Sequence, residues 1–268
     1  MERLRSLFSD LNIEYYAALA YSELKEINPH IRKRAEFEPR TAIIYLVPYY
    51  AGECKNLSRY AAARDYHIAI REIGEKIIST LKEMYPTSKS RSFGDHSPID
   101  EISAALSAGL GIRGDNGLII NERYGSYIFV GDVLTDIEPH LLGAIRPVKI
   151  ARCEGCGACK SACPTGILCG EGEDCLSSIT QRKGTITPEE RSLMQRHNTA
   201  WGCDICQEVC PHNASPKLTP LEFFRKDRIC ELSAATLGKM DDKEFSERAF
   251  GWRGRAVVER NIQILSEK

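Results

Sequence analysis

The sequence lacks the long apolar runs that a membrane-spanning segment needs. No stretch approaches the roughly 20 consecutive apolar residues of a spanning helix. The first residues, MERLRSLFSDLNIEYY, carry charges where a signal peptide has its apolar core. The sequence also lacks low-complexity stretches and repeats of about 20–50 residues, apart from an echo in its cysteine motifs. We therefore predict a cytoplasmic protein that has no membrane partner.

An excess of charge of one sign is also missing. The 36 Lys and Arg residues against 37 Asp and Glu residues give a net charge of -1. No global positive field therefore attracts a nucleic-acid backbone, and any RNA binding must be local, for example at Arg253, Arg255 and Arg260. The composition, 43% hydrophobic and 27% charged, is that of an ordinary globular protein. A chain of this length buries a core without needing disulfides.

The patterning divides the chain into three expected domains of mixed α/β, or α+β, class. Residues 1–145 read as a mixed α/β domain. Residues 146–215 read as a ferredoxin-like domain, and residues 216–268 as a charged helical tail that packs on the core. Within the first domain the expected helices and strands are a helix over 2–10, strands over 14–20 and 42–47, a helix over 61–84, and a hairpin of 117–121 with 126–134. A further helix is expected to begin with Ser97 as its cap and Pro98 in its first turn.

The cysteines are concentrated in one place. Nine of the eleven fall between Cys153 and Cys210, which is not how a structural framework of disulfides is distributed. The run Cys153-x2-Cys156-x2-Cys159-x3-Cys163-Pro has the spacing with which bacterial ferredoxins hold [4Fe–4S] clusters, the fourth cysteine reaching to a second cluster. A second cluster is therefore required.

A second motif provides the remaining ligands. Cys203-x2-Cys206-x3-Cys210-Pro repeats the end of the first motif, and Cys175 can take the place of its missing first cysteine. The crossed arrangement predicts one cluster held by Cys153, Cys156, Cys159 and Cys210, and another held by Cys163, Cys175, Cys203 and Cys206. Cys169 is an alternative to Cys175. Two structural zinc sites are the alternative to clusters, and Cys54 and Cys230 are expected to be small buried hydrophobic residues.

Several stretches resemble the epoxyqueuosine reductase family. They are Ser58–His67 (SRYAAARDYH), Asp95–Glu101, Gly109–Asn116 (GLGIRGDN), Tyr124–Tyr127, Cys175–Gly184, Trp252–Gly254 and the pair Arg260 and Asn261, together with both cysteine motifs. The sequence departs from the family at Ile112 and Asp115, where a Trp and a Lys are common, and at His96 and Ser97, which replace Thr-Gly. The family's C-terminal helical repeats have no counterpart among these residues.

The resemblance implies an oxidoreductase with two [4Fe–4S] clusters that feed electrons to a base-off cobalamin, and it makes residues 1–145 the α/β cobalamin and substrate domain. The implied reaction removes the epoxide oxygen of epoxyqueuosine in tRNA, or of a related compound, using two electrons and two protons and yielding an alkene and water. Asp95 matches the family's proton donor. The implied cofactor contacts are Ser58, Tyr60, Asp95, Arg113, Gly114, Asp115, Asn116, Thr180 and Lys183.

Two other functions share these features. A ferredoxin-like electron-transfer protein without its own substrate would need only the clusters, and an enzyme similar to reductive dehalogenases would use the same cofactors on organohalides. The implied partners are an external electron donor of the ferredoxin or flavodoxin type and tRNA or a smaller substrate.

Overall fold

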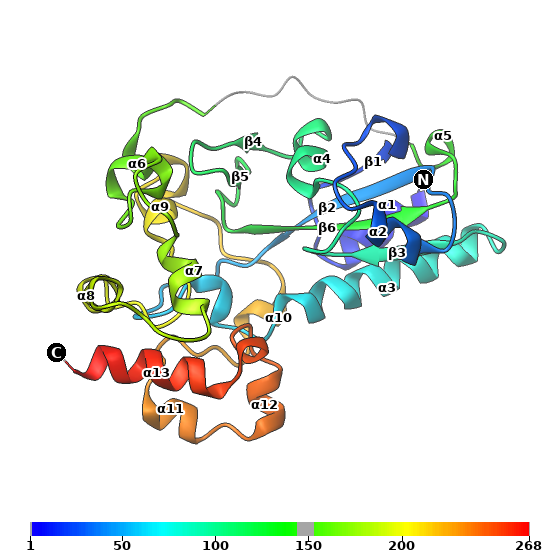
Figure 1. The fold of residues 1–268 in the computed structure, drawn as a ribbon. Coiled ribbons are helices and arrows are strands. Elements are labelled where there is room, and N and C mark those ends of the chain that lie inside the picture. Colours follow the sequence, from blue (N-terminus) through cyan, green and yellow to red (C-terminus); the bar gives the residue numbers. More distant parts are fainter. Residues whose placement is uncertain (1, 144–152, 268) are drawn as a thin grey trace. The chain divides into compact units, whose positions relative to one another are not determined.

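The computed structural model describes residues 2–143 and 153–267 (Figure 1). They form two compact units. One contains the described residues of 2–48 and 67–154, and the other contains those of 49–66 and 155–267. The expected boundary between residues 145 and 146 lies outside the described residues, and the division into three domains remains a prediction. Within the described part, no helix is both long enough and apolar enough to cross a membrane.

The first unit is built on an antiparallel sheet in the order β1-β2-β6-β3, with a separate ribbon of β4 and β5 (Figure 1). Its strands are β1 (Tyr16–Ala20), β2 (Thr41–Pro48), β3 (Ser90–Phe93), β4 (Ile112–Arg113), β5 (Ile119–Ile120) and β6 (Ile128–Thr135). Its helices are α1 (Glu2–Asp10), α2 (Pro29–Arg32), α3 (Tyr66–Met84, whose first residue belongs to the second unit), α4 (Glu101–Ser107) and α5 (Pro139–Leu142), with 3-10 turns η1 (Tyr21–Glu23) and η2 (Lys33–Ala35).

Strand β2 is buried along its whole length because helices cover both faces of the sheet. All eight of its residues are buried, as expected for its run of β-branched and aromatic side chains. On one face, Tyr45 lies close to the ring of Phe8 from α1 and donates a hydrogen bond to the Ile70 carbonyl of α3 (3.2 Å). On the other face, Ile44 shares an apolar cluster with Ala104 and Ala105 of α4. Successive side chains of β2 point to opposite faces of the sheet, so α1 and α3 pack on one face and α4 packs on the other.

Two local expectations were wrong. The cap of α4 is Asp100, whose side chain accepts a hydrogen bond from Ser103 N (3.0 Å). Ser97 is not the cap because the chain just after it pairs with residues 26–28: Ile27 N and Asn28 N both donate to Pro98 O.

The predicted hairpin also forms only at its turn. Asn121 and Gly125 exchange two backbone hydrogen bonds of 2.9 Å, but β5 pairs with β4, while β6 lies between β2 and β3. Long-range pairing of β6 in the main sheet therefore replaces the local pairing that the turn suggested.

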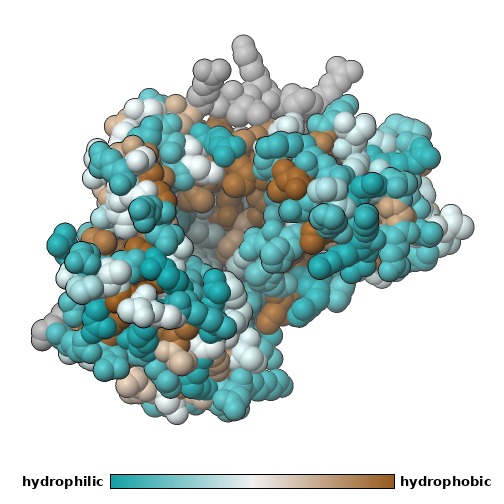
Figure 2. Space-filling view, in the orientation of Figure 1, coloured by the Kyte–Doolittle hydropathy of each residue, from teal (hydrophilic) through white to brown (hydrophobic). Residues whose placement is uncertain are grey.

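The second unit is mostly helical. Its helices are α6 (Ala158–Ala162), α7 (Leu176–Gln181), α8 (Pro188–Arg196), α9 (Ile205–Glu208), α10 (Glu222–Arg225), α11 (Ala234–Gly238), α12 (Asp242–Ser246) and α13 (Arg255–Ser266), with 3-10 turns η3 (Arg59–Ala61), η4 (Ile167–Cys169), η5 (Pro211–Asn213) and η6 (Gly251–Arg253). Trp201 and Phe250 are completely buried, and their rings pack edge to face with centroids 6.1 Å apart. Hydrophilic residues cover most of the visible face over α11, α12 and α13 (Figure 2), which agrees with this internal apolar core.

Asn261 of α13 connects two distant parts of the second unit. Its buried amide donates to Thr180 O (2.7 Å) and Ala200 O (2.8 Å). We expect Asn261→Ala to destabilise the protein by about 1–3 kcal/mol, because two buried carbonyl groups lose their donor. Thermal unfolding of the cluster-loaded protein measures this effect, and Gln263→Ala, on an exposed position of the same helix, is the control. Equal unfolding temperatures for the two variants would contradict the prediction.

Candidate functional site

The first cysteine motif lies in a coiled loop that glycines make possible. Gly155 and Gly157 have φ values of +67° and +75°, in the left-handed region that favours glycine. They allow the chain to turn tightly around Cys156 before α6 begins with Gly157 as its cap. Cys163 ends α6, and although burial raises the pKa of its thiol, backbone hydrogen bonds around Leu168 and Thr165 bring that pKa below its ordinary value. Such a thiol is readily available as a thiolate ligand.

The second motif brings three thiols together. Burial raises the pKa of the Cys203 thiol to about 12, and the neighbouring Cys175 and Cys206 thiols raise it too. Cys169, the alternative ligand, is exposed, and its sulfur lies 3.7 Å from Lys160 O. The arrangement favours Cys175 as the ligand beside Cys203 and Cys206. Among residues 2–143 and 153–267, no three Cys, His, Asp or Glu side chains converge on the position of a single bare metal ion.

Asp95 lies in the short loop between β3 and α4, in the first unit. It is a non-glycine residue with a φ of +61°, and its half-exposed carboxylate has Oδ2 3.6 Å from His67 Nε2 of α3. Its backbone N–H donates to Glu101 Oε1 (3.1 Å). The loop is therefore held by a side-chain acceptor at a position where the backbone is strained.

Asp95 belongs to a group of three neighbouring carboxyl groups, in which Glu101 and Asp132 are the more buried members. Asp132 is fully buried on β6, on the same face of the sheet as α4, and neither of its oxygens has a hydrogen-bond partner of good geometry. Burial raises the pKa of both groups, and the charges of Asp132 and Asp95 raise that of Glu101 further, while the nearby Ser97 hydroxyl acts to lower that of Asp132. Glu101 therefore carries a proton at neutral pH, directly beside Asp95.

Glu101 gives the first unit a stability that depends on pH. Its folded-state pKa lies above the unfolded value, so its contribution is complete at low pH and is lost as the pH rises through the raised pKa. Glu101→Gln keeps an acceptor for the Asp95 N–H, so we expect the variant to match the parent at about pH 5 and to exceed it in unfolding temperature at about pH 9. Glu83→Gln, an exposed change on α3, is the control. A Glu101 carboxyl carbon that titrates in the ordinary acidic range by NMR would contradict this prediction.

Sequence reasoning did not identify Glu101 or Asp132 as site residues. The available signal for Asp132 was a single acidic residue inside the apolar run FVGDVLT. Glu101 was seen only as part of a matched segment, because its contact with Asp95 depends on how the loop folds.

The loop predicted to contact a cofactor connects β4 to β5. Arg113 and Asp115 are exposed, and Gly114 is buried. A Cβ at Gly114 would lie 2.5 Å from Asn116 Oδ1, so a larger residue there would displace the Asn116 side chain. The buried Nδ2 of Asn116 has no hydrogen-bond partner. An unsatisfied donor of this kind costs free energy unless a further polar group meets it, and the loop therefore fits a bound polar group.

The other predicted cofactor contacts lie in the second unit, and most are engaged within it. Ser58 Oγ donates to the buried carboxylate of Asp204, Tyr60 Oη accepts from Trp201 Nε1 (3.0 Å), and Thr180 Oγ1 accepts from Gly202 N (2.9 Å). Lys183 is exposed in the loop after α7. Asp204, one residue after Cys203, also accepts from Arg59 N (2.7 Å), a link between the segment 49–66 and the second cysteine motif that sequence reasoning missed.

The arginines expected to offer a local RNA patch are partly used inside the second unit. Arg255 donates to Leu237 O (3.0 Å), and Arg260 donates to Gly184 O (2.7 Å). Arg253 lies over the exposed ring of Trp252, 3.8 Å from its centre. Arg255 and Arg260 thus hold backbone carbonyl groups within the second unit.

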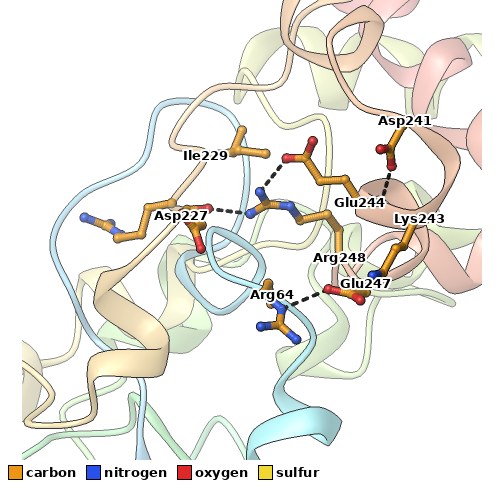
Figure 3. Close-up of a pocket in the computed structure, with 9 residues that line it drawn as sticks. Arg64, Asp227, Ile229, Asp241, Lys243, Glu244, Glu247 and Arg248 are labelled. Carbon is orange, nitrogen blue, oxygen red and sulfur yellow. Dashed lines mark hydrogen bonds and ion pairs between the residues drawn. The ribbon is translucent and has the colours of Figure 1, made fainter.

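A separate cavity of about 570 Å³ lies in the second unit, lined by Arg64 and by residues of 227–229 and 241–248 (Figure 3). Its charges are largely paired. Arg248, only 4% exposed, donates to Glu244 (2.9 Å) and to the Asp227 carbonyl (2.5 Å), and Arg64 pairs with Glu247 (3.2 Å). None of the catalytic, cofactor or metal-binding residues predicted from the sequence lines this cavity.

Residues 152–213 match a protein family described as a 4Fe–4S double cluster binding domain. The matched segment contains all eight predicted ligands. The match confirms the expectation of two [4Fe–4S] clusters over the alternative of two zinc sites.

Curated proteins similar to this chain are epoxyqueuosine reductases. That of Listeria monocytogenes is 33% identical over 212 residues, which are 75% of this chain and 54% of the relative. That of Escherichia coli is 38% identical over 176 residues, 63% of this chain and 44% of the relative. The chain spans about half the length of the curated relatives it matches. The resemblance expected from the sequence is confirmed over that part.

Solved structures show the same fold. The epoxyqueuosine reductase of Streptococcus thermophilus matches with a TM-score of 0.80 at 22% identity, covering 98% of this chain and 80% of that one. A crystal structure of an epoxyqueuosine reductase with an epoxyqueuosine-modified tRNA stem loop matches with a TM-score of 0.77 at 20% identity, with the same coverage. The expected fold class is thereby confirmed.

Proposed function

Because this chain is a sequence relative of the epoxyqueuosine reductases, we propose that it is a cobalamin-dependent iron–sulfur reductase that removes the oxygen of an epoxide. The observation that carries the proposal is the double cluster segment, residues 152–213, in a chain whose similarity to these enzymes extends over three quarters of its length. An isolated ferredoxin-like carrier would need only the first of these two features.

The protein's part in electron supply is to hold the two clusters. We assign one to Cys153, Cys156, Cys159 and Cys210 and the other to Cys163, Cys175, Cys203 and Cys206. The proximity of Cys203 to Cys175 and Cys206 supports the second set. Thiolate-bound clusters reach the low potentials that reduction of a corrin requires.

In the first unit, the proposed cobalamin contacts are those of the loop Arg113–Asn116. In the second unit, taken by itself, they are Ser58, Tyr60, Thr180 and Lys183. The unsatisfied Asn116 Nδ2 supports the loop as a contact. The bound cofactor would supply the two-electron reduction of a carbon–oxygen bond. Ser58, Tyr60 and Thr180 are committed to internal hydrogen bonds, so we propose that they shape the contact region through their backbone and their packing.

Asp95 is the proposed proton donor, to the epoxide oxygen that leaves as water. Its half-exposed side chain is accessible to a bound molecule. Glu101, protonated at neutral pH, lies next to it and is placed to return a proton after each donation. His67 accompanies Asp95 and helps to orient the carboxylate.

We propose tRNA that carries epoxyqueuosine as the substrate, because a similar enzyme has been crystallised with such a stem loop. Electrons would come from a ferredoxin or flavodoxin type of protein, and the location would be cytoplasmic. Arg253, half-buried over the exposed ring of Trp252, is the member of the expected arginine patch that we propose contacts RNA.

Anaerobic reconstitution tests the proposal. We expect about eight iron atoms per chain, retention of cobalamin through gel filtration, and conversion of epoxyqueuosine to queuosine in tRNA by the reduced protein. Full iron content without corrin binding or turnover would replace the proposal with the electron-carrier function. Turnover of an aryl halide but not of the tRNA would indicate the dehalogenase-like function.

A further inference from the structure

Two cysteines outside the cluster motifs, Cys54 and Cys230, lie opposite each other in the second unit. The segments that carry them run side by side in one register, which is given by three side-chain contacts. Each contact joins residues 176 positions apart: Arg228 to Gly52 O (2.8 Å), Lys55 to Glu231 (2.6 Å), and Asn56 to Leu232 O (2.8 Å). The same offset of 176 connects Cys54 to Cys230, so the two residues face each other at the centre of this parallel alignment.

The backbones at this point are as close as neighbouring strands. Lys55 N donates to Cys230 O (2.8 Å), and backbone hydrogen bonding holds adjacent segments about 4.7–4.9 Å apart. A disulfide bridges Cα atoms separated by about 4.4–6.8 Å. Each thiol is half-buried, and Cys230 is near enough to Cys54 to help raise the pKa of its thiol. The spacing of the two backbones therefore suits a disulfide between them.

We propose that Cys54 and Cys230 are a redox pair that closes to a disulfide when the protein meets hydrogen peroxide. One thiol sulfur attacks a peroxide oxygen, the O–O bond breaks, and water leaves to give a sulfenic acid. The second thiol then attacks the sulfenic sulfur, the S–O bond breaks, and a second water leaves. In total, two thiols and one peroxide give one disulfide and two waters, with two electrons passing from sulfur to oxygen.

The bridge would act on the segment that leads to Ser58 and Tyr60. Ala200 N donates to Asn56 O (2.6 Å), and Ser58 N donates to Trp201 O (2.7 Å). The same short segment thus contacts residues 228–232 through its first half and the approach to Cys203 through its second half. A disulfide at Cys54 would add a covalent link to this segment, which hydrogen bonds, the Lys55–Glu231 ion pair and the buried Leu57 side chain otherwise hold.

The environment of Cys54 makes its thiol slow to react near neutral pH. Burial raises the pKa of its thiol to about 12, and Cys230 adds to this, while the positive charges of Arg228 and Arg59 act in the opposite direction. Arg228 contacts the thiol directly, with its Nη2 3.8 Å from Cys54 Sγ. Because the thiolate is the reactive form, Cys54 is suited to the second step, in which it attacks the sulfenic sulfur of Cys230, and the disulfide should accumulate with sustained exposure to peroxide.

Peptide mapping of the cluster-loaded protein tests the inference. The anaerobic protein is treated with graded hydrogen peroxide, alkylated with N-ethylmaleimide and digested without reduction. We expect a linked peptide pair that contains Cys54 and Cys230, which disappears on treatment with dithiothreitol. In Cys54→Ser or Cys230→Ser the remaining cysteine should instead be trapped by dimedone as sulfenic acid.

The result that would overturn the inference is alkylation of both Cys54 and Cys230 after oxidation has already released iron from the clusters. A link between either of them and a motif cysteine would overturn it equally. The readout is a mass and not a reaction rate, so a failure of the proposed reductase activity leaves the test intact. Mapping of the parent protein alone decides the question if a serine variant does not fold.

Discussion

Replacing Asp95 with asparagine should lower the rate of epoxide reduction by about 10²- to 10⁴-fold, the range that a positioned general acid contributes. Asparagine has nearly the same shape and keeps the backbone N–H that donates to Glu101. It cannot release a proton to the departing oxygen. Iron content and cobalamin retention should therefore stay at the parent level, and the loss should appear in the single-turnover rate of queuosine formation in tRNA.

A matched control variant distinguishes loss of the Asp95 proton from the simple loss of one negative charge in the first unit. Asp10→Asn removes an exposed carboxylate at the end of α1, in the same unit, and should leave the rate unchanged. If Asp95→Asn reduces the substrate as fast as the parent, the proton comes from another group and the proposed role of Asp95 is wrong. If instead the variant loses iron, its effect is structural.

The parts of the fold that could be predicted from sequence are those set by local periodicity. The apolar run around Ile44 identified β2, and the recurrence of Ile70, Ile73 and Ile77 identified α3, although that helix begins at Tyr66 and not near Ala61. Cysteine spacing predicted the cluster segment because a turn of fixed length must place each thiol at one corner of a cluster.

The parts that could not be predicted depend on contacts between distant residues. Ser97 has the residue type of a helix cap, yet the chain beside it is used to pair with residues 26–28. The neighbouring carboxyl groups of Glu101 and Asp132 come from a helix and a strand whose approach no spacing in the sequence reveals. The match at Arg260 and Asn261 gave no hint that both side chains fix backbone carbonyls.

The choice between Cys175 and Cys169 gives the second large effect. Cys175→Ala should reduce the iron content from about eight to about four atoms per chain, because a cubane that loses one of its four thiolates is no longer held. Substrate reduction should be abolished, since electrons then lack one of the two clusters that feed the cofactor. Iron analysis of anaerobically purified protein, with the absorbance of the clusters, measures the first effect.

Cys169→Ala is the matched control, because it makes the same chemical change six residues away in the same segment. Cys169 is exposed and its sulfur meets only the Lys160 carbonyl among the contacts described for it, whereas Cys175 lies with Cys203 and Cys206. We therefore expect the control to keep about eight iron atoms and the parent rate. The reverse pattern, with iron lost from the Cys169 variant and kept in the Cys175 variant, would require the chain around η4 to rearrange when the cluster forms. The electrostatic grouping of thiols around Cys203 would then describe only the protein without its iron.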